Sequence, residues 1–174
     1  MLAAAAPAHP QGGAAATQAR LCTRSTGEAA TAACRRALEL GLPPARQPAI
    51  EALLAARLAG EERWDDVVEV YRAAVGRRPE DGEARLRLGA ALLHMKGQVA
   101  EAEVALREAV RLRPEDAEAR VALGSALSAL GRGAEAASTF EEALRLDPKV
   151  LDGRPAARAI YEAARQGEPW PEGR

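Results

Sequence analysis

The sequence predicts an all-α fold built from repeated pairs of antiparallel helices. Apolar residues make up 48% of the chain and aromatic residues only 3%. Most of the apolar residues are Ala and Leu, which favour helices over strands. Pro79, Pro114 and Pro148 lie 35 and 34 residues apart, and a period near 34 residues is typical of helix-turn-helix repeats. Composition and period therefore both indicate a fold of repeated helix pairs.

Residues 1–20 are predicted to be a disordered tail or a residual export segment. They are mostly Ala, Gly, Pro and Gln without hydrophobic periodicity, so they cannot bury enough surface to offset the cost of ordering. Residues 1–6 are too short, and lack the basic residues, for a signal peptide, although Ala6-Pro7-Ala8 resembles a cleavage site. Either an export signal precedes this start or the segment is simply a tail.

Residues 21–47 predict a half repeat that caps the array. Their apolar spacing matches that of the last second helix, with Ala30, Cys34, Ala37 and Leu40 at the places of Ala136, Phe140, Ala143 and Leu146. A repeat array needs such caps because its end repeats would otherwise expose an apolar face.

Three full repeats are predicted at residues 48–81, 82–116 and 117–150. Segments 83–92 and 118–127 agree in residue type at almost every position. Gly89 with Ala102, and Gly124 with Ala136, are expected where the two helices of a repeat approach most closely, because a large side chain there would separate them. In the first repeat Ala55 and Val67 hold these places, so we expect its two helices to lie slightly further apart.

Local signals agree with this register. Asp81 and Asp116 stand at N-cap positions, and Gly97 and Gly131 follow the first helices of their repeats. After the last repeat, residues 151–167 predict a solvating helix, and residues 168–174, which contain Trp170, a tail. The expected first turn of this helix holds Pro155, and its apolar stripe is Ala156, Ile160, Ala163 and Ala164.

These residues closely resemble the tetratricopeptide repeat family, firmly over residues 48–150 and loosely over 28–47. The resemblance implies a right-handed helical solenoid that binds other proteins in a concave groove lined by the first helices. It places on that groove Ala49, Ala52, Ala56, Leu86, Ala90, Leu93, Val121, Ser125 and Ser128. Arg85, Arg87 and Arg120 either add a basic rim to the groove or pack along their stems with solvated heads.

The expected partner is a helical or extended apolar peptide segment. Some members of the family clamp a chaperone's carboxylate tail with Lys and Asn, but this chain has no Asn, and Lys96 and Lys149 do not fall on groove positions. Two alternatives stay open: self-association as an assembly component, and an accessory role beside an enzyme or secretion complex. The formal charge of −1 predicts no binding to nucleic acid, and no apolar run is long enough to cross a membrane, so we expect a soluble protein.

The inventory of side chains predicts no enzyme. The two histidines are His9, in the tail, and His94, at a helix end, so we expect no metal cluster, no catalytic residue and no cofactor. Carboxylates occur at surface helical spacings beside arginines, where ordinary surface pairing explains them.

Cys22 and Cys34 would lie about 18 Å apart in one continuous helix, so they bond only if the chain turns between them. Residues 23–27 contain residues typical of turns. The placement of one cysteine on either side of such a turn resembles that of some exported bacterial repeat proteins. Either the two cysteines form a disulfide, which implies an exported or periplasmic protein, or Cys34 is a buried core residue of a cytoplasmic one, with Cys22 an idle thiol.

Overall fold

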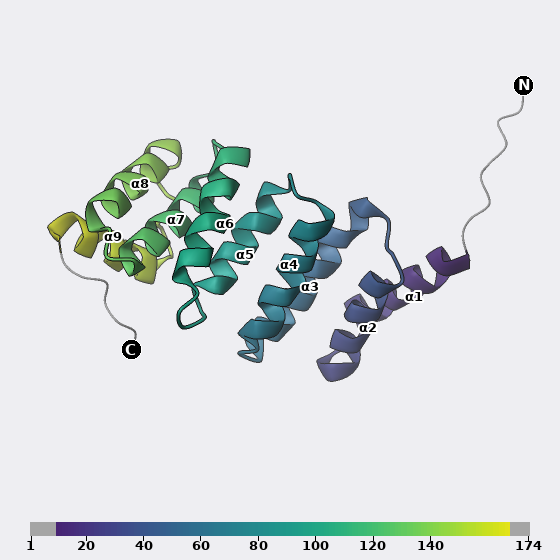
Figure 1. Cartoon of the computed structure of the whole chain (residues 1–174). Helices are drawn as coiled ribbons and strands as arrows, with labels where there is room; N and C mark the ends of the chain where they lie inside the picture. Colours follow the sequence, from purple (N-terminus) through teal and green to yellow (C-terminus); the bar gives the residue numbers. More distant parts are fainter. Residues whose placement is uncertain (1–9, 168–174) are drawn as a thin grey trace, which may run out of the picture. The chain divides into compact units, whose positions relative to one another are not determined.

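A computed structural model describes residues 10–167, and within this range every regular element is a helix (Figure 1). The helices are α1 (Pro10–Arg24), α2 (Gly27–Glu39), the short 3₁₀ helix η1 (Pro44–Arg46), α3 (Gln47–Gly60), α4 (Trp64–Arg77), α5 (Gly82–Leu92), α6 (Val99–Leu112), α7 (Ala117–Ala129), α8 (Gly133–Leu146) and α9 (Pro155–Gln166). The predicted all-α class is confirmed. The chain forms two compact units, Met1–Val70 and Tyr71–Arg174.

In the first unit, α1 and α2 pack together as a helical hairpin. The prediction of disorder is wrong for residues 10–20, which form most of α1; residues 1–9 lie outside the described part. Ala15, Ala19 and Cys22 are all buried, and their spacing of four and three residues puts them on one helix face. A stripe of such small side chains carries little hydrophobic signal, but it allows α2 to approach closely. The predicted half repeat is therefore a complete helix pair.

The first predicted repeat begins with α3. Leu54 and Leu58 are buried, as are Ala55 and Val67, the two residues that replace the small close-approach pair. The first repeat thus keeps an apolar interior at the expected positions. The wider spacing of its helices stays a prediction.

In the second unit, α5–α6 and α7–α8 are antiparallel pairs that follow one another side by side (Figure 1). The two first helices lack a side chain where their partners come nearest. A Cβ atom added to Gly89 would lie 2.4 Å from Leu106 Cγ and 3.2 Å from the Ala102 carbonyl oxygen. At Gly124 it would lie 2.8 Å from the Phe140 ring. The glycines therefore receive the large side chains of the second helices.

The predicted N-caps are confirmed. An Oδ1 oxygen of Asp81 accepts a hydrogen bond from the Ala84 N–H at 3.1 Å, and Asp116 does the same with the Ala119 N–H at 3.1 Å. Partial burial alone would raise the pKa of Asp81, but the Ala84 N–H and the Arg78 guanidinium outweigh it, and the pKa is lowered. The carboxylate form of this cap is therefore stabilised by folding.

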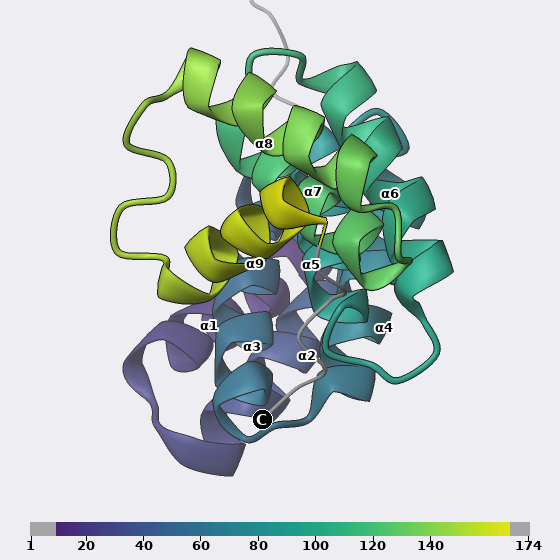
Figure 2. The ribbon, with the colours of Figure 1, turned by 90° about the vertical axis from the view of Figure 1, so that its left-hand side faces the viewer.

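The helix α9 closes the C-terminal end by lying against α7 and α8 (Figure 2). The preceding segment supplies Val150 and Leu151 to a hydrophobic cluster that also holds Val121 and Phe140. Ala157, Ile160 and Tyr161 of α9 pack against this cluster, and Ala164 is buried too. The apolar stripe is thus shifted from the predicted one, since Ala156 is exposed. Trp170 lies outside the described residues.

Candidate partner-binding surface

One face of α5 and α7 stays partly open in the second unit. Glu83, Arg87 and Ala90 share a face of α5 by helical spacing, as Glu118 and Ala122 do on α7. Arg87 joins the two helices because its guanidinium lies 2.7 Å from Glu83 and 3.5 Å from Glu118. We call this surface the first-helix face; its members are Glu83, Arg87, Ala90, Leu93, His94, Glu118, Ala122 and Ala129.

The structure separates the predicted groove residues into buried and accessible ones. Leu86, Val121, Ser125 and Ser128 are buried, with exposed fractions of 2%, 5%, 9% and 3%. The Ser125 hydroxyl donates a hydrogen bond to the Val121 carbonyl oxygen at 3.1 Å, within the same helix. These four side chains form the layer beneath a surface rather than the surface itself.

Ala90 and Leu93 are half-buried, whereas Ala49, Ala52 and Ala56, in the first unit, are exposed. Sequence reasoning missed Ala122 and Ala129, which are also half-buried. Both follow Glu118 at spacings that keep them on its helix face, so helical spacing alone could have identified them from the sequence. The accessible apolar strip therefore consists of Ala90, Leu93, Ala122 and Ala129.

The three arginines predicted as a basic rim are all engaged within the chain. Arg85 Nε donates to the Pro79 carbonyl oxygen at 2.8 Å, and Arg120 donates to the equivalent carbonyl of Pro114. Arg87 makes the two ion pairs given above. Burial alone would lower its pKa, but the neighbouring carboxylates raise it, so it stays charged. Partial burial lowers the pKa of His94, which favours the neutral form of this imidazole.

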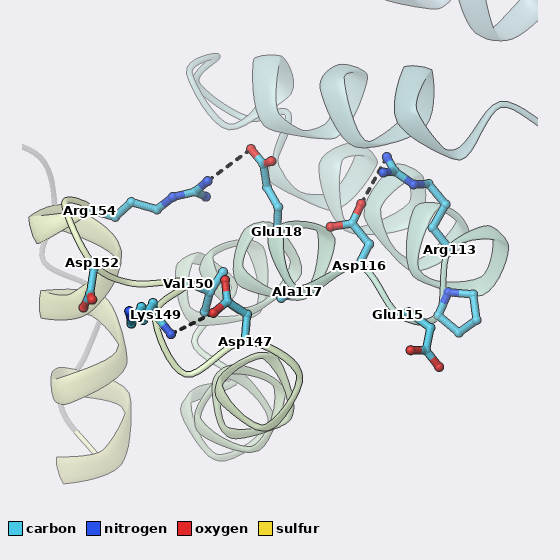
Figure 3. A pocket seen from close by; sticks show the side chains of 11 residues that line it. Arg113, Glu115, Asp116, Ala117, Glu118, Asp147, Lys149, Val150, Asp152 and Arg154 are labelled. Atoms are coloured by element: carbon cyan, nitrogen blue, oxygen red, sulfur yellow. Dashed lines mark hydrogen bonds and ion pairs between the residues drawn. The ribbon is translucent and has the colours of Figure 1, made fainter.

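An open cleft of about 780 Å³ lies at the edge of the same unit (Figure 3). It is lined by the turn between α6 and α7, the first turn of α7 and the segment between α8 and α9: Arg113, Pro114, Glu115, Asp116, Ala117, Glu118, Asp147, Lys149, Val150, Asp152 and Arg154. Arg154, before α9, lies 3.5 Å from Glu118 of α7, and on the other side of the cleft Arg113 lies 3.1 Å from its neighbour Asp116. Five of the lining side chains are acidic and three are basic, so the cleft is acidic on balance.

Cys22 and Cys34 form a disulfide in the first unit, with an S–S distance of 2.09 Å and a Cα–Cα distance of 4.7 Å. Residues 25–26 separate α1 from α2, so the chain turns where the sequence has turn chemistry. Arg57 of α3 donates hydrogen bonds to the carbonyl oxygens of Cys22 and Ser25, at 3.0 and 3.2 Å. The end of α1 is thus held by one covalent bond and by a cation at its carbonyl end.

The structure offers no candidate for metal binding in residues 10–167, where no group of three or more His, Cys, Asp or Glu side chains is placed to hold an ion. Among the helices of the same residues, none is both long enough and apolar enough to cross a bilayer.

Successive helix pairs whose first helices share a partly open face define a helical-repeat scaffold. A tetratricopeptide repeat family model matches residues 53–106 and 95–150, which together span more than half of the chain. The chain belongs to the tetratricopeptide repeat family. No curated protein matches it.

Several solved structures share the fold. The TPR2B domain of yeast Sti1, in its complex with pHsp70, is 24% identical with a TM-score of 0.60, and the match covers 69% of this chain and 97% of that domain. YrrB, a protein with an unusual peptide-binding site, is 23% identical with a TM-score of 0.63, over 90% and 75% of the two chains. A thermophilic TPR protein of Thermus thermophilus, TTC0263, is 18% identical with a TM-score of 0.58, over 90% and 99%.

Proposed function

We propose that this protein is a non-catalytic scaffold for protein–protein interaction that binds a helical or extended apolar segment of a partner along the first-helix face. The observation that carries the proposal is the apolar strip of Ala90, Leu93, Ala122 and Ala129, which is half-buried rather than covered. Small side chains leave room for a partner's larger ones, and a few alkyl anchors supply most of the affinity at such surfaces.

The charges beside the strip support an apolar partner rather than a carboxylate tail. Arg87 is already paired with Glu83 and Glu118, so it has no unsatisfied charge to offer. A terminal carboxylate needs several fixed donors, and the face lacks both Lys and Asn. Two fold neighbours, the Sti1 domain with pHsp70 and YrrB with its peptide-binding site, support peptide binding as the general mode.

The test uses a fluorescent amphipathic peptide with leucines at helical spacing, and a matched peptide with serine in place of leucine. We expect saturable binding of the leucine peptide, measured by anisotropy. Ala90→Glu should weaken it about tenfold, since a charge in an apolar contact costs more than about 1.4 kcal/mol. Ala134→Glu is the matched control, because Ala134 is exposed at the start of α8, and it should leave binding unchanged.

Equal binding of the two peptides, or equal effects of the two variants, would show that the strip is not the binding surface. Light scattering addresses self-association. A dimer that Ala90→Glu dissociates would make a second copy of the chain the occupant of the face.

A further inference from the structure

The helix α1 contributes little to the packing of the first unit apart from its cysteine. Among the side chains of α1 that the structure describes, the buried ones are Ala15, Ala19 and Cys22. An alanine methyl group contributes much less on burial than a leucine side chain, because the hydrophobic free energy scales with the buried area. Leu21, the leucine of α1, is 45% exposed. Apolar packing alone therefore holds α1 weakly against α2.

The segment also has a low preference for the helical state. Gly12 and Gly13 stand in succession near its start, and glycine is the least favourable residue in a helix apart from proline. A Cβ atom added to either would have nothing within 4 Å, so no close approach requires a glycine there. The hydrogen bonds from Arg57 reach carbonyl oxygens at the other end of α1, those of Cys22 and Ser25. The disulfide is therefore the main restraint on α1.

Both cysteines are inaccessible once α1 is in place, since Cys22 and Cys34 are each 0% exposed. Cys34 shares a face of α2 with Ala30 and Ala37 by helical spacing, and these two alanines are 0% exposed as well. In the repeat register this is the face on which a second helix receives the first helix of its repeat. Thiol–disulfide exchange needs a thiolate to reach one of the two sulfurs, and the docked α1 prevents this.

We propose that α1 is a latch closed by oxidation: it docks stably onto α2 only after Cys22 and Cys34 are oxidised, and the docked helix then shields the disulfide from reductants. The oxidant is the disulfide of a thiol compound or of a thiol–disulfide oxidoreductase. One cysteine thiolate attacks this disulfide and releases one thiolate, and the other cysteine thiolate attacks the mixed disulfide and releases the second.

Two electrons thus pass from the two cysteines to the oxidant, and the two protons that the cysteines lose are taken up by the two released thiolates. A thiol-oxidising reaction therefore completes the N-terminal end of the array, because before it the apolar face of α2 has no stable cover. This latch does not depend on the first-helix face, which belongs to the second unit.

The test compares two samples of the full chain, both refolded from urea, one with dithiothreitol and one with oxidised glutathione. Hydrogen exchange followed by mass spectrometry reports on each helix. The amides of α1 should exchange at least about tenfold faster in the reduced sample, because the disulfide no longer suppresses opening of the helix. Those of α9, in the second unit, should exchange equally in both samples.

The shielding is tested by the reverse reaction. Dithiothreitol is added to the oxidised chain with and without urea, and free thiols are counted over time. Thiols should appear at least about tenfold more slowly without urea, because α1 must open before the reductant reaches a sulfur.

Three variants separate the disulfide from the helix itself. Cys22→Ser combined with Cys34→Ser should exchange in α1 like the reduced sample, whichever reagent is present. Gly12→Ala combined with Gly13→Ala strengthens α1 without a new contact, so it should slow exchange of the reduced sample by at least about threefold. Gly60→Ala is the matched control, because Gly60 lies in α3 and its added atom also has nothing within 4 Å; it should leave exchange in α1 unchanged.

The proposal is overturned if α1 exchanges equally slowly in the reduced and oxidised samples, or if the double serine variant behaves like the oxidised one, since packing alone would then dock the helix. It is equally overturned if exchange in α9 changes as much as in α1, or if dithiothreitol reduces the folded chain as fast as the unfolded one. None of these results bears on the leucine peptide, whose binding tests the first-helix face alone.

Discussion

Gly124→Ala tests the closest approach of two helices in the second unit. The added Cβ atom would lie 2.8, 2.9 and 3.1 Å from three carbons of the Phe140 ring. Phe140 is fully buried, and its ring packs against Tyr161 with centroids 5.6 Å apart. The ring cannot move aside without disturbing α9, so the strain stays in the α7–α8 pair.

The magnitude follows from two opposing effects. Overpacking a dense core by one methyl group costs about 1–3 kcal/mol, and the helix preference of Ala over Gly returns about 1 kcal/mol. Gly124→Ala should therefore destabilise the second unit by about 1 kcal/mol. Gly76→Ala is the matched control, because it is also helical but has nothing within 4 Å of the added atom, and it should stabilise by about 0.5–1 kcal/mol.

Urea unfolding followed by circular dichroism measures both variants, and hydrogen exchange of α7 and α8 locates the effect. Two results would refute the close approach: a Gly124→Ala protein at least as stable as the parent, or one whose change equals that of Gly76→Ala.

Three further predictions concern other contacts. Replacing Cys22 and Cys34 together by Ser should cost about 3 kcal/mol, as expected for a closed loop of about twelve residues, and should speed hydrogen exchange in α1; unchanged exchange there would show that packing alone holds α1. Asp81→Ala should cost about 1 kcal/mol at pH 7. Because folding lowers the pKa of Asp81, its contribution is complete above about pH 4, the unfolded value. It is lost as the pH falls through the folded pKa, so the urea midpoints of parent and variant should converge as the medium is made more acidic. Glu103→Gln removes a carboxylate that lies 2.5 Å from Arg132; the loss should be under about 1 kcal/mol and should shrink in high salt.

The repeats of the second unit were predictable because one contact is made in each of them. A residue without a side chain is needed where Leu106 or Phe140 reaches the first helix, and an Asp is needed to cap the helix that follows each proline. Because these contacts recur once in every repeat, the residue types that they require recur in the sequence at the same period. This is why Gly89, Gly124 and Asp116 all fall where the sequence predicts them.

The helix α1 could not be predicted by the same reasoning. Its buried residues are Ala15, Ala19 and Cys22, and alanines are equally common in the rest of the segment. Hydrophobic periodicity depends on a contrast between apolar and polar faces, which an Ala- and Gly-rich helix lacks. The disulfide and the hydrogen bonds from Arg57 hold α1 in place, and both depend on residues distant from most of it.

The register predicted the binding face only in part, because a register assigns each residue to a side of its helix without showing what covers that side. Val121 occupies the same repeat position as Leu86, yet it lies in the cluster formed with Val150 and Leu151 of the C-terminal segment. The end of an array is where this covering differs from repeat to repeat. The cleft is such a difference too, since Asp147 departs from the arginine of the preceding repeat. Val150 likewise stands where the preceding repeat has Asp116: one side chain packs into the terminal cluster and the other caps a helix, although the register gives them the same position.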